Sequence, residues 1–275
     1  MKETIRFKYV ITSGQIGSFI AFDSFLKDCE KKKLEKIIIN TNTENKFNIK
    51  DKHGNHQISK LLINNSFYNK SIKIVEKKLS KKKFEKYIAN KNFISTKIFF
   101  KNFYNKKLHL DKNINIKNSS FMKIKNADID KFNLPKNYCV IVAWSKRKEK
   151  KFSKKDWEEL IKILKANNIK GIILNSYYRK DVEVPEHNLL IDMTGKTTLL
   201  ESIEITKNAN CYIGINGCLS VIAMQKYPRK CMIKSCVKNF KWFYCFYPKV
   251  KNIKRVFFNN INSKAKNNLI KQINK

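Results

Sequence analysis

Short apolar runs alternate with segments of helical period along the chain, and this alternation predicts an α/β protein with parallel sheets. In the front half, apolar runs predict three strands, at Phe7–Thr12, Lys36–Asn40 and Ser71–Val75. Two segments repeat apolar residues at helical spacing, Ile16–Cys29 and Lys81–Asn90. Between residues 93 and 130 the pattern weakens, and irregular structure is expected there.

The back half has the clearer pattern. Its apolar runs predict strands at Tyr138–Ala143, Gly171–Leu174, Leu189–Ile191, Cys211–Ile215 and Cys231–Lys234. Helices are predicted at Lys154–Asn167, Thr198–Lys207, Leu219–Lys226 and Asn262–Asn274. Ser153 is a suitable N-cap for the first of these helices. Strands that alternate with helices indicate a parallel sheet covered on both faces.

A polar segment at Asp128–Lys136 separates the two halves and suits a linker. Both halves follow the same plan, so the expected architecture is two Rossmann-like domains that face a cleft. The expected domains are residues 1–134 and residues 135–275.

The formal net charge is +37, from 59 basic and 22 acidic residues, and it is spread evenly over both halves. Only five of the basic residues are Arg, and the abundance of Lys and Asn is typical of A/T-rich codons. Codon bias does not explain the depletion of acids, since the codons of Asp and Glu tolerate A/T richness. No Asp or Glu follows Glu204. Such a chain attracts polyanions, among them nucleic acid, anionic lipid headgroups and phosphorylated glycans.

No apolar run approaches the ~18–20 residues that span a bilayer. The N-terminal residues also lack the apolar core of a secretory signal, so a soluble cytoplasmic protein is expected. Association with the inner face of the membrane stays open. The seven cysteines form no CxxC pair and are expected to be reduced structural thiols, and no metal-like spacing of Cys and His is present.

Two turns in Leu190–Ile222 follow predicted strands and open onto predicted helices, an arrangement that suits a phosphate. The first, Thr194–Thr198, resembles the end of a Walker A motif, but Leu190 stands where that motif requires its first glycine. A plain helix cap and a phosphate contact from Lys196 are both open interpretations. The second, Gly214–Cys218, has two glycines, which allow either a tight turn or close approach of a ligand.

Two further segments combine lysines with aromatic residues. Trp144–Phe152 follows a predicted strand and is either a solvated charged loop or part of a ligand site at the carboxyl end of the sheet. Lys238–Lys254 suits either stacking on bases or sugars or packing of the C-terminal segment onto the domain.

Three spaced elements resemble the ADP-heptose:lipopolysaccharide heptosyltransferase family, glycosyltransferase family 9, over roughly Tyr138–Lys234. The family element K-x-W-P-x-x-x-W is similar to Lys150–Trp157, with Phe for the first Trp and Ser for Pro, and the family's hydroxyl residue five positions earlier matches Ser145. The family element T-G-x-[ST]-[ST]-L resembles Thr194–Leu199, and its D-[ST]-G-x-x-H turn lines up with Asn216–Val221.

This resemblance implies the GT-B fold and transfer of a sugar from a nucleotide-diphosphate donor to a lipopolysaccharide or another anionic surface glycan or glycolipid. Lys150 and the turn Thr194–Thr197 would neutralise the leaving diphosphate, so neither a metal nor a cofactor is expected. The implied donor-binding residues are Ser145, Lys150, Thr194, Gly195, Lys196, Thr197, Asn216, Gly217, Cys218 and Ser220.

The sequence departs from the family at its acid–base positions. Ser18 stands where the family has the aspartate that takes the acceptor proton, and Asp23 is the candidate surrogate, so the implied catalytic residues are Ser18, Asp23 and Lys150. Asn216 and Val221 replace the family's Asp and His. Two alternatives stay open: a related enzyme that glycosylates nucleic acid, which the charge favours, and a non-catalytic relative, which these replacements favour.

Overall fold

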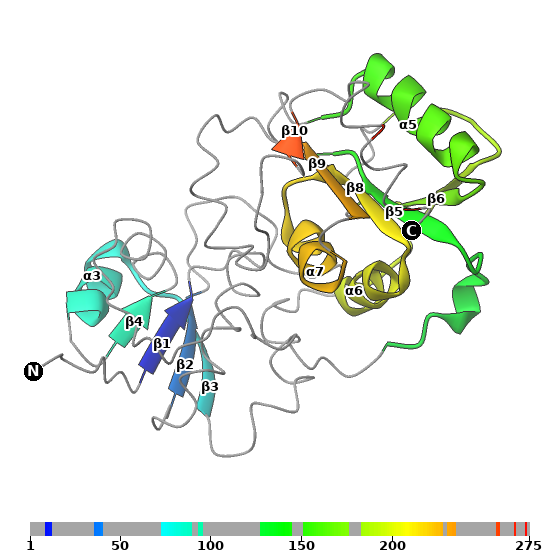
Figure 1. Cartoon of the computed structure of the whole chain (residues 1–275). Coiled ribbons are helices and arrows are strands. Elements are labelled where there is room, and N and C mark those ends of the chain that lie inside the picture. The colour runs from blue at the N-terminus through cyan, green and yellow to red at the C-terminus, as the bar shows by residue number, and fades with distance from the viewer. Residues whose placement is uncertain are drawn as a thin grey trace, which may run out of the picture. The chain divides into compact units, whose positions relative to one another are not determined.

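The computed structural model of the chain describes residues 9–12, 36–40, 73–89, 93–95, 127–144, 151–175, 183–227, 230–234 and 257–258, together with Asn267 and Ile273. The chain divides into two compact units, Met1–Lys125 and Asn126–Lys275 (Figure 1). The helix predicted at Ile16–Cys29 and the aromatic segment Lys238–Lys254 lie outside the described residues.

The first unit contains a parallel sheet of four strands, in the order β3-β2-β1-β4. The strands are β1 (Tyr9–Thr12), β2 (Lys36–Asn40), β3 (Lys73–Lys77) and β4 (Phe93–Ser95). The three predicted strands are confirmed, with small shifts of their ends. β4 falls where irregular structure was expected, because a strand of three residues is too short to show a period in the sequence.

Helix α3 (Lys81–Ala89) confirms the helix predicted after β3. Its Phe84 and Tyr87 pack against the buried side chains of Ile38 and Leu79. The lysines of this helix point to solvent, so its apolar residues account for its attachment to the unit.

The second unit contains a parallel sheet of six strands, in the order β10-β9-β8-β5-β6-β7. The strands are β5 (Tyr138–Val142), β6 (Lys170–Ile173), β7 (Leu190–Asp192), β8 (Cys211–Ile215), β9 (Cys231–Lys234) and β10 (Phe257–Phe258). The five predicted strands are confirmed. The two-residue strand β10 was not predicted, because two residues carry no pattern of their own.

Three helices cover this sheet: α5 (Lys154–Ala166), α6 (Leu199–Asn208) and α7 (Cys218–Lys226). α6 contacts α7 on one face, and α5 covers the opposite face (Figure 1). The predicted cap is confirmed, since the Ser153 hydroxyl accepts a hydrogen bond from the Asp156 N–H at the start of α5. The α/β class with parallel sheets is therefore confirmed for the described residues.

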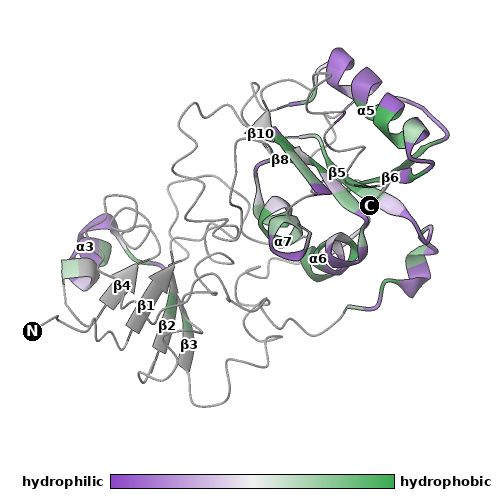
Figure 2. Cartoon of the chain, viewed as in Figure 1, coloured by the Kyte–Doolittle hydropathy of each residue, from purple (hydrophilic) through white to green (hydrophobic). Residues whose placement is uncertain are grey.

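The core of the second unit lies between the sheet and α5, which turns its apolar side inward and its charged side outward (Figure 2). Leu160, Ile163 and Leu164 are fully buried there. Full burial of each such side chain stabilises the fold by about 1.5–3 kcal/mol. Ile273 also packs against this core, and both Ile273 and Asn267 are helical, as expected for the closing helix.

Helix α7 differs from α5, since six consecutive residues from Leu219 to Met224 are buried. A helix that is apolar all round belongs inside a protein. The N-terminus of α7 is therefore held in place by burial along most of its length, and it begins directly at the end of β8.

Candidate functional site

The strand order places a switch in chain direction between β5 and β8. From β5 the chain passes through α5 to β6, whereas from β8 it passes through α7 to β9 on the other side. The two connections therefore leave over opposite faces of the sheet. Open α/β sheets bind ligands at such a switch point, beyond the carboxyl ends of the strands. The residues that follow β5 and β8 are therefore the first candidates for a site.

The turn after β8 leaves room for a ligand at the backbone. Gly217 has an extended backbone, and a Cβ added to it would meet nothing within 4 Å. The Ser220 hydroxyl accepts a hydrogen bond from the Gly217 N–H at 3.0 Å and donates one to the Gly217 carbonyl at 2.7 Å. The first turn of α7 contains no acidic residue. The positive end of the α7 dipole is therefore not neutralised by a carboxylate of its own first turn, which favours an anionic ligand.

Cys218 lies in this first turn of α7. Burial raises the pKa of its thiol from 9.0 to about 11, although hydrogen bonds from the backbone N–H groups of Leu219 and of Cys218 itself act in the opposite direction. The thiol is therefore neutral at physiological pH, and what Cys218 offers a phosphate is its backbone. The four cysteines among the described residues are free thiols: Cys139, Cys211, Cys218 and Cys231.

The turn after β7 is tightly held by its own hydrogen bonds. Gly195 adopts a left-handed backbone with φ of 71°, and its N–H donates to the Asn175 carbonyl at 3.1 Å. The Thr194 hydroxyl accepts from the Asn175 side-chain amide at 3.2 Å. The Lys196 ammonium donates to the Asp192 carbonyl at 2.8 Å. The polar groups of this turn are therefore engaged in hydrogen bonds that stabilise the turn.

The start of α6 already carries a negative charge. The Thr198 hydroxyl accepts from the Glu201 N–H, and the Glu201 carboxylate accepts from the Thr198 N–H, so the two residues form a capping box. The Thr197 hydroxyl bonds to the Ser202 hydroxyl at 2.8 Å. Because Glu201 occupies this helix end, the α7 turn suits an anion better than the α6 turn does.

Glu201 also pairs with Lys131, with 2.6 Å between the carboxylate and the ammonium. Burial alone raises the pKa of Glu201, but the hydrogen bond from Lys131 and the hydrogen bonds from Thr198 outweigh it, so the pKa lies below the ordinary 4.5. The residue is therefore ionised at neutral pH.

The two predicted turns do not share one small pocket. β7 and β8 are separated by β6 and β5 in the sheet, so their ends are three strand spacings apart. At about 4.8 Å per strand this separation is about 14 Å. A ligand that contacts both turns must extend along the edge of the sheet, as a nucleotide sugar does and a lone phosphate does not.

The loop after β5 returns to the same edge. The Phe152 N–H donates to the Ala143 carbonyl at 3.1 Å, and the Lys151 ammonium lies 5.2 Å from the centre of the Trp144 ring. The predicted residues Ser145 and Lys150 lie outside the described residues, as do Ser18 and Asp23. Their assignments stay predictions.

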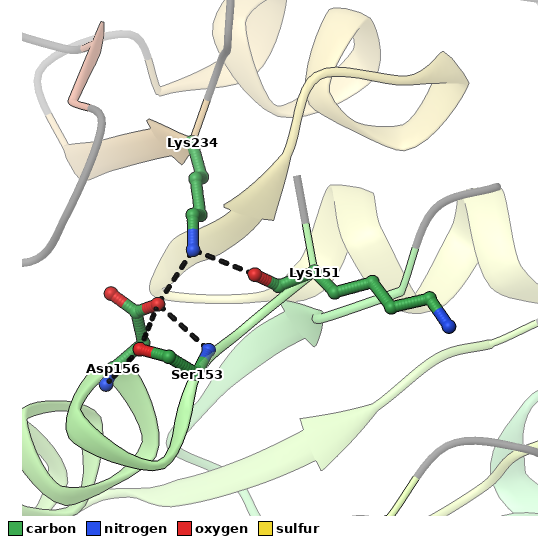
Figure 3. A network of polar contacts seen from close by, with 4 residues as sticks. All are labelled: Lys151, Ser153, Asp156 and Lys234. Atoms are coloured by element: carbon green, nitrogen blue, oxygen red, sulfur yellow. Dashed lines mark hydrogen bonds and ion pairs between the residues drawn. The ribbon is translucent and has the colours of Figure 1, made fainter. Parts of the chain in front are cut away.

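Three polar residues at this edge were not predicted from the sequence: Asn175, Lys234 and Asp156. Asn175 follows β6, and its side-chain oxygen is buried without a hydrogen-bond partner. Lys234 ends β9 and forms a buried ion pair with Asp156 in the first turn of α5 (Figure 3). One signal is readable in the sequence, because Asn175 and Lys234 are each the first polar residue that follows a run of apolar residues.

The part of the chain that the structure describes holds no group of three or more His, Cys, Asp or Glu residues that could bind a metal ion. It also holds no helix that is both long and apolar enough to cross a membrane.

Solved structures share this architecture. Escherichia coli ADP-heptose lps heptosyltransferase II is 8% identical to the chain, with 97% of each chain covered and a TM-score of 0.59. The chain has the heptosyltransferase fold. This finding confirms the resemblance that the motifs indicated, and at this identity the fold is what is shared.

Other solved structures with the heptosyltransferase fold align less well. A glycosyl transferase family 9 protein from Veillonella parvula is 13% identical to this chain. The alignment covers 84% of this chain and 81% of the Veillonella protein, with a TM-score of 0.48. The iron-containing glycosyltransferase TibC from enterotoxigenic E. coli is 14% identical to this chain. The alignment covers 82% of this chain but only 58% of TibC, and its TM-score is 0.47. No family model and no curated protein sequence matches the chain.

Proposed function

We propose that this protein is a glycosyltransferase of the GT-B type that takes its sugar from a nucleotide-diphosphate donor. The observation that carries the proposal is the α7 N-terminus at the switch point of the second sheet, with an open approach at Gly217 and no acidic residue in its first turn. The fold shared with ADP-heptose heptosyltransferase II over 97% of both chains supports the same assignment.

In this proposal the second unit binds the donor. The diphosphate lies against the backbone N–H groups at the start of α7, and the rest of the donor extends along the edge towards the turn after β7. Lys150 neutralises the charge that develops on the leaving diphosphate, which is electrostatic stabilisation of the transition state. No metal or cofactor is required in this scheme. The first unit binds the acceptor and supplies the base, with Asp23 as the candidate base and Ser18 at the position of the family's aspartate.

The proposed acceptor is an anionic glycan or glycolipid such as a lipopolysaccharide. The net charge of +37 would draw such an acceptor to the protein through long-range attraction. We further propose a cytoplasmic location, with contact to the inner face of the membrane where a glycolipid acceptor is inserted.

The decisive experiment measures ADP binding by calorimetry and release of nucleotide diphosphate from ADP-heptose and other nucleotide sugars. Replacement of Lys150 by Ala is expected to lower the rate of release by at least about tenfold, because one charged contact to the transition state is worth that much or more. Lys165→Ala is the matched control, since Lys165 is an exposed lysine in the last turn of α5. Absence of binding and release with every donor, or equal rates for Lys150→Ala and wild type, would contradict the proposal.

A second candidate is a protein that binds a nucleotide sugar without turning it over. Val221, at the position where the family resemblance places a histidine, is only 2% exposed, inside α7. It offers no proton at that position. Binding of the donor without release of nucleotide, under conditions in which several acceptors are supplied, would favour this candidate.

A further inference from the structure

Lys234 is buried although it carries a charge. It is 4% exposed, and its partner Asp156 is 1% exposed. Lysine is almost never buried so completely unless it is paired. A buried ion pair is not in itself a strong source of stability, since well-packed apolar residues often replace such a pair at no cost. Stability alone is therefore a weak reason for this pair.

The ammonium of Lys234 has three groups around it. It donates to the Asp156 carboxylate at 2.6 Å and to the Lys151 carbonyl at 2.6 Å (Figure 3). It also lies 5.8 Å from the centre of the Phe152 ring. An ammonium has three N–H groups, so an anion, a carbonyl and an aromatic face account for all of them.

Asp156 extends this network to the backbone of the loop after β5. The carboxylate oxygen that receives Lys234 also accepts from the Ser153 N–H at 2.9 Å and from the Ser153 hydroxyl at 2.8 Å. The Phe152 N–H in turn donates to the Ala143 carbonyl. The main chain from Lys151 to Ser153 is thereby fixed at the carboxyl end of β5.

The backbone of Lys234 holds the other loop. Its carbonyl accepts a hydrogen bond from the Asn216 N–H at 3.1 Å, directly before Gly217. β9 neighbours β8, and β8 neighbours β5. A single residue on β9 therefore contacts both loops of the switch point, the one after β8 through its carbonyl and the one after β5 through its ammonium.

We infer that Lys234 is a positioning residue that sets the separation of these two loops, between which the nucleotide diphosphate binds. The inference rests on the proposed function for the identity of the ligand. The geometric part, that Lys234 holds the main chain at Lys151–Ser153, rests on the contacts alone.

The test uses two variants. The first removes the Lys234 ammonium, and the second also removes the negative charge of Asp156. Lys234→Met leaves the Asp156 carboxylate buried without its cation, so this variant is expected to be less stable and to bind ADP more weakly. The double variant Lys234→Met with Asp156→Asn has no unpaired charge, and Asn can still accept from the Ser153 N–H. Its stability to urea is expected to recover, whereas its affinity for ADP stays about tenfold below wild type, because the bond to the Lys151 carbonyl is still missing.

Lys170→Met is the matched control. Lys170 also donates from a strand to a backbone carbonyl, that of Asn188 at 2.7 Å, but it lies at the amino end of β6. The ADP affinity of the Lys170→Met variant is expected to equal that of wild type. If the double variant recovers both stability and ADP affinity, Lys234 has only a structural role and the inference is wrong.

A second readout needs no ligand. Amide hydrogen exchange at Phe152, measured in the unliganded protein, is expected to be about tenfold faster in the double variant, with no change in the amides of β6. Unchanged exchange at Phe152 would overturn the inference even if ADP binds. If wild type binds no nucleotide while Phe152 exchanges faster in the variant, the proposed function fails and the positioning by Lys234 stands.

Discussion

At the scale of single residues, two glycines that lie four residues and one residue before the start of α7 have different structural roles. A Cβ added to Gly214 would lie 2.8 Å from the Val142 carbonyl oxygen and 2.9 Å from the Tyr212 hydroxyl, whereas one added to Gly217 would meet nothing within 4 Å. Gly214 is therefore required by the close packing of β8 on β5. Packing of the described residues does not require a glycine at position 217, which agrees with the ligand approach proposed above.

This contrast gives a matched pair of variants. Gly214→Ala is expected to destabilise the protein by about 1–3 kcal/mol, because the added methyl group overlaps backbone atoms of β5. Gly217→Ala is expected to leave the midpoint of urea unfolding unchanged and to weaken ADP binding severalfold. Urea unfolding and calorimetry check the two effects. Wild-type affinity in Gly217→Ala would show that no ligand approaches the backbone there.

Cys218 has a testable chemical consequence. With its pKa at about 11 in place of 9.0, its thiolate at neutral pH is about a hundredfold scarcer than that of an ordinary thiol. Alkylation of Cys218 by iodoacetamide, followed by mass spectrometry, is expected to be slow at neutral pH and to accelerate as the pH approaches that pKa. Glutathione in the same tube serves as the reference thiol. Rapid labelling of Cys218 at neutral pH would contradict this prediction.

At the scale of elements, helix ends show what local sequence can and cannot specify. The start of α5 at Ser153 was predicted because capping involves residues three apart. The strand order was not predicted, because it depends on which side of β5 each crossover returns. The pair of Lys234 and Asp156 joins residues 78 positions apart, and sequence patterns carry no signal at that distance.

The same limit applies to the candidate site. The turns after β7 and β8 were predicted from glycines and hydroxyl residues that follow apolar runs. The sequence did not indicate that the polar groups of the first turn bond to Asn175, Asp192 and Ser202. It also did not indicate that the two turns are separated by two strands, since that separation follows from the strand order.

The ion pair at the start of α6 makes stability depend on pH. The pKa of Glu201 is lowered in the folded protein and that of Lys131 is raised, so both shifts stabilise the state in which both groups are charged. The contribution from Glu201 is present above its unfolded pKa and is lost as the pH falls through its lower folded pKa. Lys131→Met is therefore expected to lower stability at neutral pH and to have no effect once Glu201 is protonated, below 4.5.

Urea unfolding of wild type and Lys131→Met across this pH range tests the ion pair. Lys136→Met is the control, because Lys136 is an exposed lysine of the same segment. A difference between wild type and Lys131→Met that persists unchanged in acid would show that Lys131 acts through packing.

At the scale of the whole molecule, the chain reaches a fold shared with a heptosyltransferase at 8% identity. The strands of the second unit are buried apolar runs, and many sequences satisfy that requirement equally well. In the proposed function, substrate choice depends instead on the few polar residues at the carboxyl edge, which are a small part of the sequence. Proteins with the same fold can therefore use different sugar donors. For this reason the release experiment proposed above includes several nucleotide sugars besides ADP-heptose.

The Lys131–Glu201 ion pair also shows how the start of the second unit is held. It anchors the short 3-10 helix Asp130–Phe132 to α6, and the Tyr138 N–H is further bound to the Asn210 side chain at 2.9 Å. The first residues of the second unit, which begins at Asn126, are thereby bound to α6 and to the residue before β8. The ion pair thus joins the segment before β5 to a helix that covers the six-stranded sheet, so it acts within the second unit.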